Sequence, residues 1–132
     1  MLFMSPRGRC IGCHDGANLT DGGFHNIGVG YRSGSFADVG RFAITGVASD
    51  TGAFKTPSLR NVALTAPYFH DGTGATLRDV VHRYNLGGTP NPYQDSLVTP
   101  LGLTSQQEDY LVAFLESLTG APPTITAPPL PE

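Results

Sequence analysis

Residues 10–14 read Cys-Ile-Gly-Cys-His, two thiols three positions apart followed at once by a histidine. On one turn of helix, Cys10 and Cys13 project from the same face, so both sulfurs can add to the two vinyl groups of one porphyrin. His14 then stands where its imidazole reaches the iron as the proximal ligand. We call residues 10–14 the haem motif, and it predicts one covalently attached haem c.

Three other uses of the two cysteines fit the sequence less well. A thioredoxin-like redox pair needs a strand leading into the motif, and residues 1–9 are too short and too polar to supply one. A structural zinc site needs a second Cys/His pair, whereas the other histidines stand singly and there is no third cysteine. A disulfide between the two cysteines would close a small, strained loop.

The composition suits a chain laid over an apolar cofactor. Only 14% of the 132 residues are charged and 17 are glycine, which favours long loops, with haem supplying much of the core. The net charge of -3 and the pI near 5.7 argue against binding to nucleic acid or to an anionic membrane.

The sequence contains neither a membrane-spanning apolar run nor a recognisable signal peptide. Covalent haem attachment takes place outside the bacterial cytoplasm, so we expect a periplasmic protein. Either a leader has been lost or the sequence begins within a longer protein, and we favour the second explanation.

The periodicity predicts an all-α, cytochrome c-like haem domain with long ordered loops. Leu2 and Phe3 resemble the tail of a truncated first helix, which would pack on the last one. Residues 15–31 are rich in Gly, Asn and Asp and predict an ordered loop. Ser35 to Phe42 predicts a short helix, with Gly46 ending it.

Three further helices are expected, over 58–64, 77–84 and 105–118. Thr56 with a following proline, Thr76, and Thr104 with Gln107 provide their N-caps. The last helix carries a clear apolar stripe and should end at Gly120. We assign residues 1–120 to the cytochrome c domain and 121–132 to a Pro-rich flexible tail.

The sixth iron ligand decides the chemistry of a haem site. A downstream methionine is excluded, because Met1 and Met4 both precede Cys10. An open distal site is one alternative, and the side chains that could serve are Tyr84, His25, His70, His82 and Lys55. Tyr84 lies on the apolar face of its helix, where core packing is the simpler interpretation, but a phenolate ligand there would favour ferric iron and lower the potential.

Several segments resemble the C-terminal haem domain of the bacterial di-haem cytochrome c peroxidase family, which includes the MauG-like enzymes. The longest is residues 52–72, from Gly-Ala-Phe-Lys-Thr-Pro to Tyr-Phe-His-Asp-Gly. Residues 24–29, 76–85 and 100–104 agree as well. The resemblance covers nearly all of the chain before the Pro-rich tail.

The resemblance implies specific roles. Tyr84 falls where the peroxidases carry an axial methionine and MauG-like members carry tyrosine, which favours Tyr84 as the sixth ligand. A calcium ion between the two domains would use the backbone carbonyls of Thr65 and Pro67, with its other ligands outside this chain. Lys55 and Arg60 are candidates to pair with the haem propionates.

The single haem motif departs from the two-haem pattern of the family, so the peroxidatic domain is missing. We therefore expect the electron-relay half of a peroxidase or MauG-like oxidase, acting with an electron-donor protein and a second haem domain. The intact enzyme would reduce hydrogen peroxide or use it to oxidise a protein, while this half would transfer electrons only. The alternatives are a free-standing mono-haem carrier or small-ligand sensor, and a gene fragment that never matures alone.

Overall fold

The computed structural model describes residues 1–121. The short strands are β1 (Phe24–His25), β2 (Tyr31–Arg32), β3 (Ser35–Phe36) and β4 (Phe54–Lys55), and the helices are α1 (Phe42–Thr45), α2 (Leu77–Asn85) and α3 (Ser105–Ser117). Single 3₁₀ turns occupy Leu2–Met4, Cys10–Gly12, Ala48–Asp50 and Val62–Leu64. Of the tail expected at 121–132, residues 122–132 lie outside the described residues.

The expectation of an all-α fold is wrong, because the first half of the chain forms two small antiparallel sheets. β1 pairs with β4, placing Phe24 opposite Lys55, and β2 pairs with β3. The β2–β3 turn has positive φ at both central residues, 50° at Ser33 and 87° at Gly34, as a type I′ hairpin requires. The Ser33–Gly34 turn thus makes a hairpin where a helix was expected.

The helix expected over 35–42 is wrong for the same reason. Ser35 and Phe36 belong to strand β3, and α1 begins only at Phe42. Gly46 does end α1, in the left-handed conformation with φ 66° that glycine adopts without strain.

The helix expected over 58–64 is wrong as well, since only Val62–Leu64 forms a 3₁₀ turn. The Ser58 hydroxyl donates to the Asn18 carbonyl over 2.7 Å and accepts the N–H of Arg60 over 3.1 Å. Such local side-chain bonds compete with helix formation. They fasten this segment to the loop that follows the haem motif.

The two remaining helices are confirmed. Both begin with a capping box, in which the Thr76 hydroxyl accepts the N–H of Asp79 and the Thr104 hydroxyl accepts that of Gln107. α3 ends at Ser117 rather than at Gly120, whose N–H instead donates to the Asn61 side chain over 2.8 Å.

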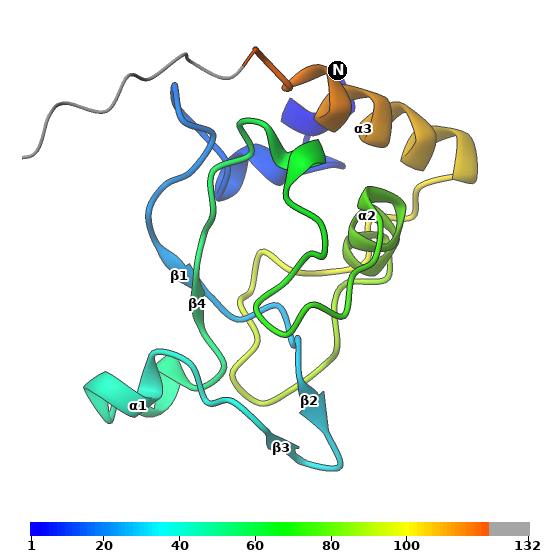
Figure 1. The fold of residues 1–132 in the computed structure, drawn as a ribbon. Coiled ribbons are helices and arrows are strands. Elements are labelled where there is room, and N and C mark those ends of the chain that lie inside the picture. Colours follow the sequence, from blue (N-terminus) through cyan, green and yellow to red (C-terminus); the bar gives the residue numbers. More distant parts are fainter. Residues whose placement is uncertain (122–132) are drawn as a thin grey trace, which may run out of the picture.

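The main hydrophobic core lies on the helical side of the molecule, where α2 and α3 run beside each other (Figure 1). The N-terminal segment packs against α3 through a 3₁₀ turn at Leu2–Met4, with the rings of Phe3 and Phe114 4.8 Å apart. The buried members are Phe3, Leu59, Leu77, Val81, Leu103, Leu111 and Leu115.

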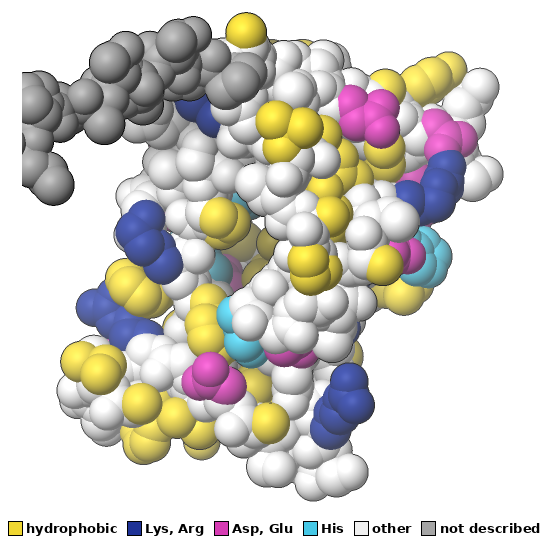
Figure 2. All heavy atoms as spheres, in the orientation of Figure 1, with side chains coloured by type: hydrophobic (Ala, Val, Ile, Leu, Met, Phe, Trp, Pro, Cys, Tyr) yellow, Lys and Arg dark blue, Asp and Glu magenta, His cyan; other side chains and the backbone are white. Residues whose placement is uncertain are grey.

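The strands and α1 form the other side of the molecule (Figure 1). A hollow opens between the two sides, with hydrophobic atoms on its floor (Figure 2). Among the described residues, no large side chain is fully enclosed by protein. Within residues 1–121, no helix is both long and apolar enough to cross a membrane.

Candidate haem site

The haem motif is held in a helical turn. Cys10–Gly12 forms a 3₁₀ turn, and the N–H of His14 donates to the Cys10 carbonyl over 2.9 Å. Arg9 precedes the turn in the left-handed conformation, and its guanidinium bonds to Thr99 on a distant loop. The motif is therefore anchored at its start.

The imidazole of His14 is oriented by a backbone carbonyl. Its Nδ1 lies 3.0 Å from the carbonyl oxygen of Leu19. Because a carbonyl only accepts hydrogen bonds, Nδ1 carries the hydrogen and Nε2 keeps its lone pair for a metal. Burial lowers the pKa of His14 despite this carbonyl, so the ring is neutral near pH 7. This is the tautomer that an iron ligand needs.

Cys10 and Cys13 are free thiols, not joined to each other, and both are half-buried. Burial raises the pKa of each to about 11. The Cys10 thiol donates to the Gly8 carbonyl over 3.3 Å. Both sulfurs are thus available as protonated thiols, the form that adds across vinyl groups.

Tyr84 reaches the motif from α2. It is half-buried, and burial first, then the nearby groups of Cys13 and Cys10, raise the pKa of its hydroxyl above the usual value. The two thiols therefore lie within electrostatic range of the Tyr84 hydroxyl. Helix α2 brings this residue to the motif from the other half of the chain.

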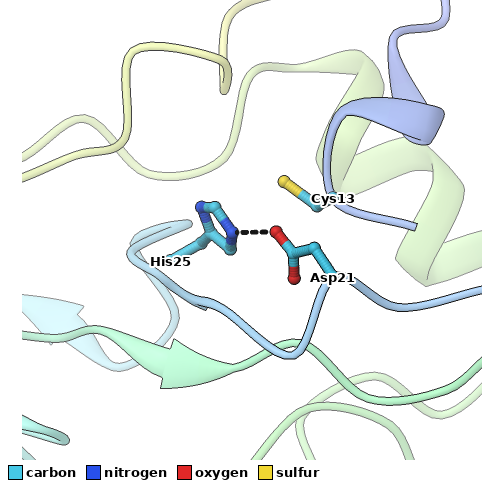
Figure 3. A group of neighbouring side chains, drawn as sticks. All are labelled: Cys13, Asp21 and His25. Carbon is cyan, nitrogen blue, oxygen red and sulfur yellow. Dashed lines mark hydrogen bonds and ion pairs between the residues drawn. The ribbon is translucent and has the colours of Figure 1, made fainter. Parts of the chain in front are cut away.

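Two other candidate ligands are already engaged. His25 lies between two carboxylates: its Nε2 is 2.8 Å from Asp21 (Figure 3), and its Nδ1 is 2.5 Å from Asp95. Burial would lower the pKa of His25, but these hydrogen bonds outweigh it and raise the pKa. His82 uses Nδ1 to contact Glu108 over 3.0 Å, and its side chain is 56% exposed.

His70 and Lys55 have other contacts. The His70 ring stacks on Phe54 with centroids 3.5 Å apart. Lys55 is exposed in β4 and donates to the Thr56 carbonyl over 3.5 Å. Within the described residues, no hydrogen bond joins either side chain to the haem motif.

The remaining predicted site residues lie outside this neighbourhood. Arg60 is exposed, and its guanidinium donates to the Ala17 carbonyl in the loop after His14. Thr65 and Pro67 are exposed and follow the 3₁₀ turn Val62–Leu64. The Thr65 N–H and hydroxyl both donate to the Val62 carbonyl.

The described residues fit a covalently bound haem. The donor set combines two free thiols with a neutral imidazole whose Nε2 is available, and Tyr84 adds an oxygen within electrostatic range of both thiols. The hydrophobic floor of the hollow matches the apolar faces of a porphyrin (Figure 2).

The comparisons with known proteins agree with this chemistry. The chain is 38% identical over 155 residues to the cytochrome-c peroxidase IdrP2 of Denitromonas iodatirespirans, covering 98% of this chain and 41% of that protein. It is also 38% identical over 130 residues to the methylamine utilization protein MauG of Methylorubrum extorquens, covering 98% of this chain and 36% of MauG. Over nearly its whole length the chain is a homologue of the cytochrome c peroxidases and MauG.

A solved structure supports the same relationship. The crystal structure of a MauG-like protein associated with microbial copper homeostasis superposes with a TM-score of 0.85 at 34% identity, over 91% of this chain and 45% of that one. No family model matches the chain. The chain spans about two fifths of the length of the curated relatives it matches. These homologues support a haem-binding, peroxidase-like domain and imply haem c as the cofactor.

Sequence reasoning missed three partners of the site. Leu19 acts through its backbone carbonyl, which leaves no trace in residue type. Asp21 and Asp95 hold His25 from two separate loops. Asp21 lies four residues before His25 and could have been suspected, but nothing local links Asp95 to it.

Proposed function

We propose that the chain is a mono-haem electron-relay domain that passes single electrons between a donor protein and a second haem. Cys10 and Cys13 would hold the haem through thioether bonds, His14 would bind the iron through Nε2, and Tyr84 would supply the sixth ligand. The observation that carries this proposal is the convergence of the free thiols, the oriented His14 and the Tyr84 hydroxyl in one neighbourhood.

The haem, when bound, supplies a one-electron ferric–ferrous couple. The protein tunes that couple from both sides. On one side, the Leu19 carbonyl holds the Nδ1 hydrogen of His14, which fixes the ring and makes Nε2 a stronger donor. On the other, Tyr84 would bind as a hard anionic oxygen that favours ferric iron. Both effects lower the reduction potential.

The second haem and the donor are assigned to other proteins or to other parts of a longer protein. The chain has one haem motif and spans about two fifths of its relatives. With a partner haem domain, we expect the assembly to reduce hydrogen peroxide or to use it to oxidise a protein. We place it in the periplasm, where haem is attached covalently.

Exposed residues around the site are proposed to bind the haem propionates and a calcium ion. Lys55 is proposed to pair with a haem propionate, because its ammonium is exposed in β4 beside the Thr56 carbonyl. Arg60 is the second candidate, although its guanidinium already contacts Ala17. The carbonyls of Thr65 and Pro67 are proposed calcium ligands, to be completed by a neighbouring domain.

The relay function is tested by maturing the full chain with haem in a periplasmic host and titrating it electrochemically. We expect one haem per chain, a reversible one-electron transition and no sustained turnover of hydrogen peroxide. Peroxide turnover by the chain alone, at a rate above that of free haem, would contradict the relay role. Rapid carbon monoxide binding by the ferrous protein would instead favour a small-ligand sensor.

A further inference from the structure

Near Cys13 of the haem motif, one histidine, His25, contacts two carboxylates, those of Asp21 and Asp95. Cys13, Asp21 and His25 have their functional atoms within 4.8 Å of one another (Figure 3). His25 contacts Asp21 through Nε2 and Asp95 through Nδ1. We call these three side chains, Asp21, His25 and Asp95, the His25 bridge.

The bridge is fixed to the motif through its backbone. The N–H of Asp21 donates to the Cys13 carbonyl over 2.8 Å, so the Asp21 carboxylate follows the position of Cys13. The Asp21 side chain also accepts the Gly23 N–H over 2.8 Å. Hydrogen bonds, chiefly from His25 and Gly23, outweigh burial and lower the pKa of Asp21 to about 2, so it is ionised at neutral pH.

The other end of the bridge fastens a distant loop. The Asp95 N–H donates to the Asn26 carbonyl over 3.0 Å, and Asp95 Oδ1 accepts the Leu97 N–H over 2.8 Å. Leu97 in turn reaches Gly12 of the motif, because its Cδ1 lies 3.5 Å from where a Gly12 Cβ would stand. The bridge therefore sets how residues 95–97 lie against the motif.

We propose that His25 is a positioning residue that holds the Asp21 and Asp95 carboxylates beside the Cys13 thioether. Through their negative charge, these two carboxylates lower the reduction potential of the haem. This inference rests on the proposed haem-binding function. Even with a positively charged imidazole, two carboxylates leave the bridge with a net negative charge. Negative charge beside the haem stabilises the ferric form, and the half-buried positions of His25 and Asp95 weaken screening by solvent there.

The test compares Asp21→Asn and Asp95→Asn with Asp109→Asn, all in the haem-loaded chain. Asp109 provides a matched loss of one carboxylate, since it is an exposed α3 residue paired with Arg78 on the helical side. At a fixed electrode potential, each bridge variant should raise the ratio of ferrous to ferric protein about tenfold, and Asp109→Asn should change it little. Equal ratios in all three variants would overturn the inference.

Two further measurements keep the test decisive. Hydrogen exchange should show residues 95–97 exchanging several-fold faster in His25→Leu, which can bond neither carboxylate, than in Asp109→Asn. Equal exchange would refute the positioning role. If Asp95→Asn fails to mature, Asp95→Glu keeps the charge and should keep the wild-type ratio, and a shifted ratio would count against the inference. Haem loading of the wild type tests the proposed function separately.

Discussion

The Nδ1 of His14 lies 3.0 Å from the carbonyl oxygen of Leu19, in the loop that directly follows the haem motif. Residues 15–19 thus turn back on the histidine that precedes them, and the Arg60 guanidinium secures this loop through the Ala17 carbonyl. This loop, rich in glycine and polar residues, orients the His14 imidazole.

Removing the thiols should weaken haem attachment in two steps. Cys10→Ala and Cys13→Ala should each keep haem through one thioether bond, while the double variant should release all haem under denaturing conditions. Mass spectrometry of the denatured protein measures the covalent haem. If haem stayed bound to the denatured double variant, the attachment chemistry assigned here would be wrong.

Gly28 should tolerate no side chain. It has φ +76°, and a Cβ there would collide with the carbonyl oxygen of Thr89. We expect Gly28→Ala to cost about 1–3 kcal/mol of unfolding free energy beyond the cost of Gly16→Ala. Gly16 is a matched control, because its φ is +64° with nothing within 4 Å of its Cβ position. Chemical denaturation of both variants measures the difference, and equal stabilities would contradict the clash.

The N-cap of α2 should contribute measurably to stability. The Thr76 hydroxyl accepts the Asp79 N–H over 3.1 Å, and the Asp79 carboxylate accepts the Thr76 N–H over 2.8 Å. Thr76→Ala should lower the free energy of unfolding by about 1 kcal/mol. Since α2 carries Tyr84, loss of this cap should also loosen the distal side of the site. An unchanged denaturation midpoint would show that the cap is dispensable.

Glu108 should make stability depend on pH on the acid side. It is 5% exposed on α3; burial would raise its pKa, but hydrogen bonds from His82 and Asn85 outweigh burial and lower it below 4.5. A lowered pKa in the folded state means that the contribution of Glu108 is present above about pH 4.5 and is lost as the pH falls through the folded value.

Thermal unfolding from pH 6 down to pH 3 tests whether the stability contributed by Glu108 is lost as the pH falls. The wild type should lose stability more steeply than Glu108→Gln as the pH falls. Glu116→Gln, an exposed α3 carboxylate, is the control and should follow the wild type. Parallel curves for the wild type and Glu108→Gln would contradict the role of the buried carboxylate.

The sequence predicted the parts of the fold in which local signals and the global structure agree. Thr76 and Thr104 cap α2 and α3 as expected, since capping boxes act within four residues. The first half was misjudged because its strands are two residues long and depend on partners elsewhere, as β1 depends on β4. Ser58 shows the same limit, because its bond to Asn18 outweighs a plausible helix start.

The candidate site likewise has a part that local sequence predicts and a part that only folding brings together. The haem motif could be recognised because its chemistry resides in adjacent residues. The His25 bridge could not, because Asp95 approaches His25 only through folding. His25 was a reasonable ligand candidate from its residue type, and only its two carboxylate neighbours show that its nitrogens are already engaged.

The proposed haem site depends most directly on Tyr84 as the iron ligand opposite His14. The deciding measurement is the ferric absorption spectrum of the haem-loaded chain, recorded for the wild type, Tyr84→Phe and Tyr110→Phe, whose ring is an exposed α3 control. We predict that Tyr84→Phe alone abolishes a phenolate charge-transfer band and changes the coordination state. Coinciding spectra for all three proteins would contradict the account and return Tyr84 to the role of a core residue.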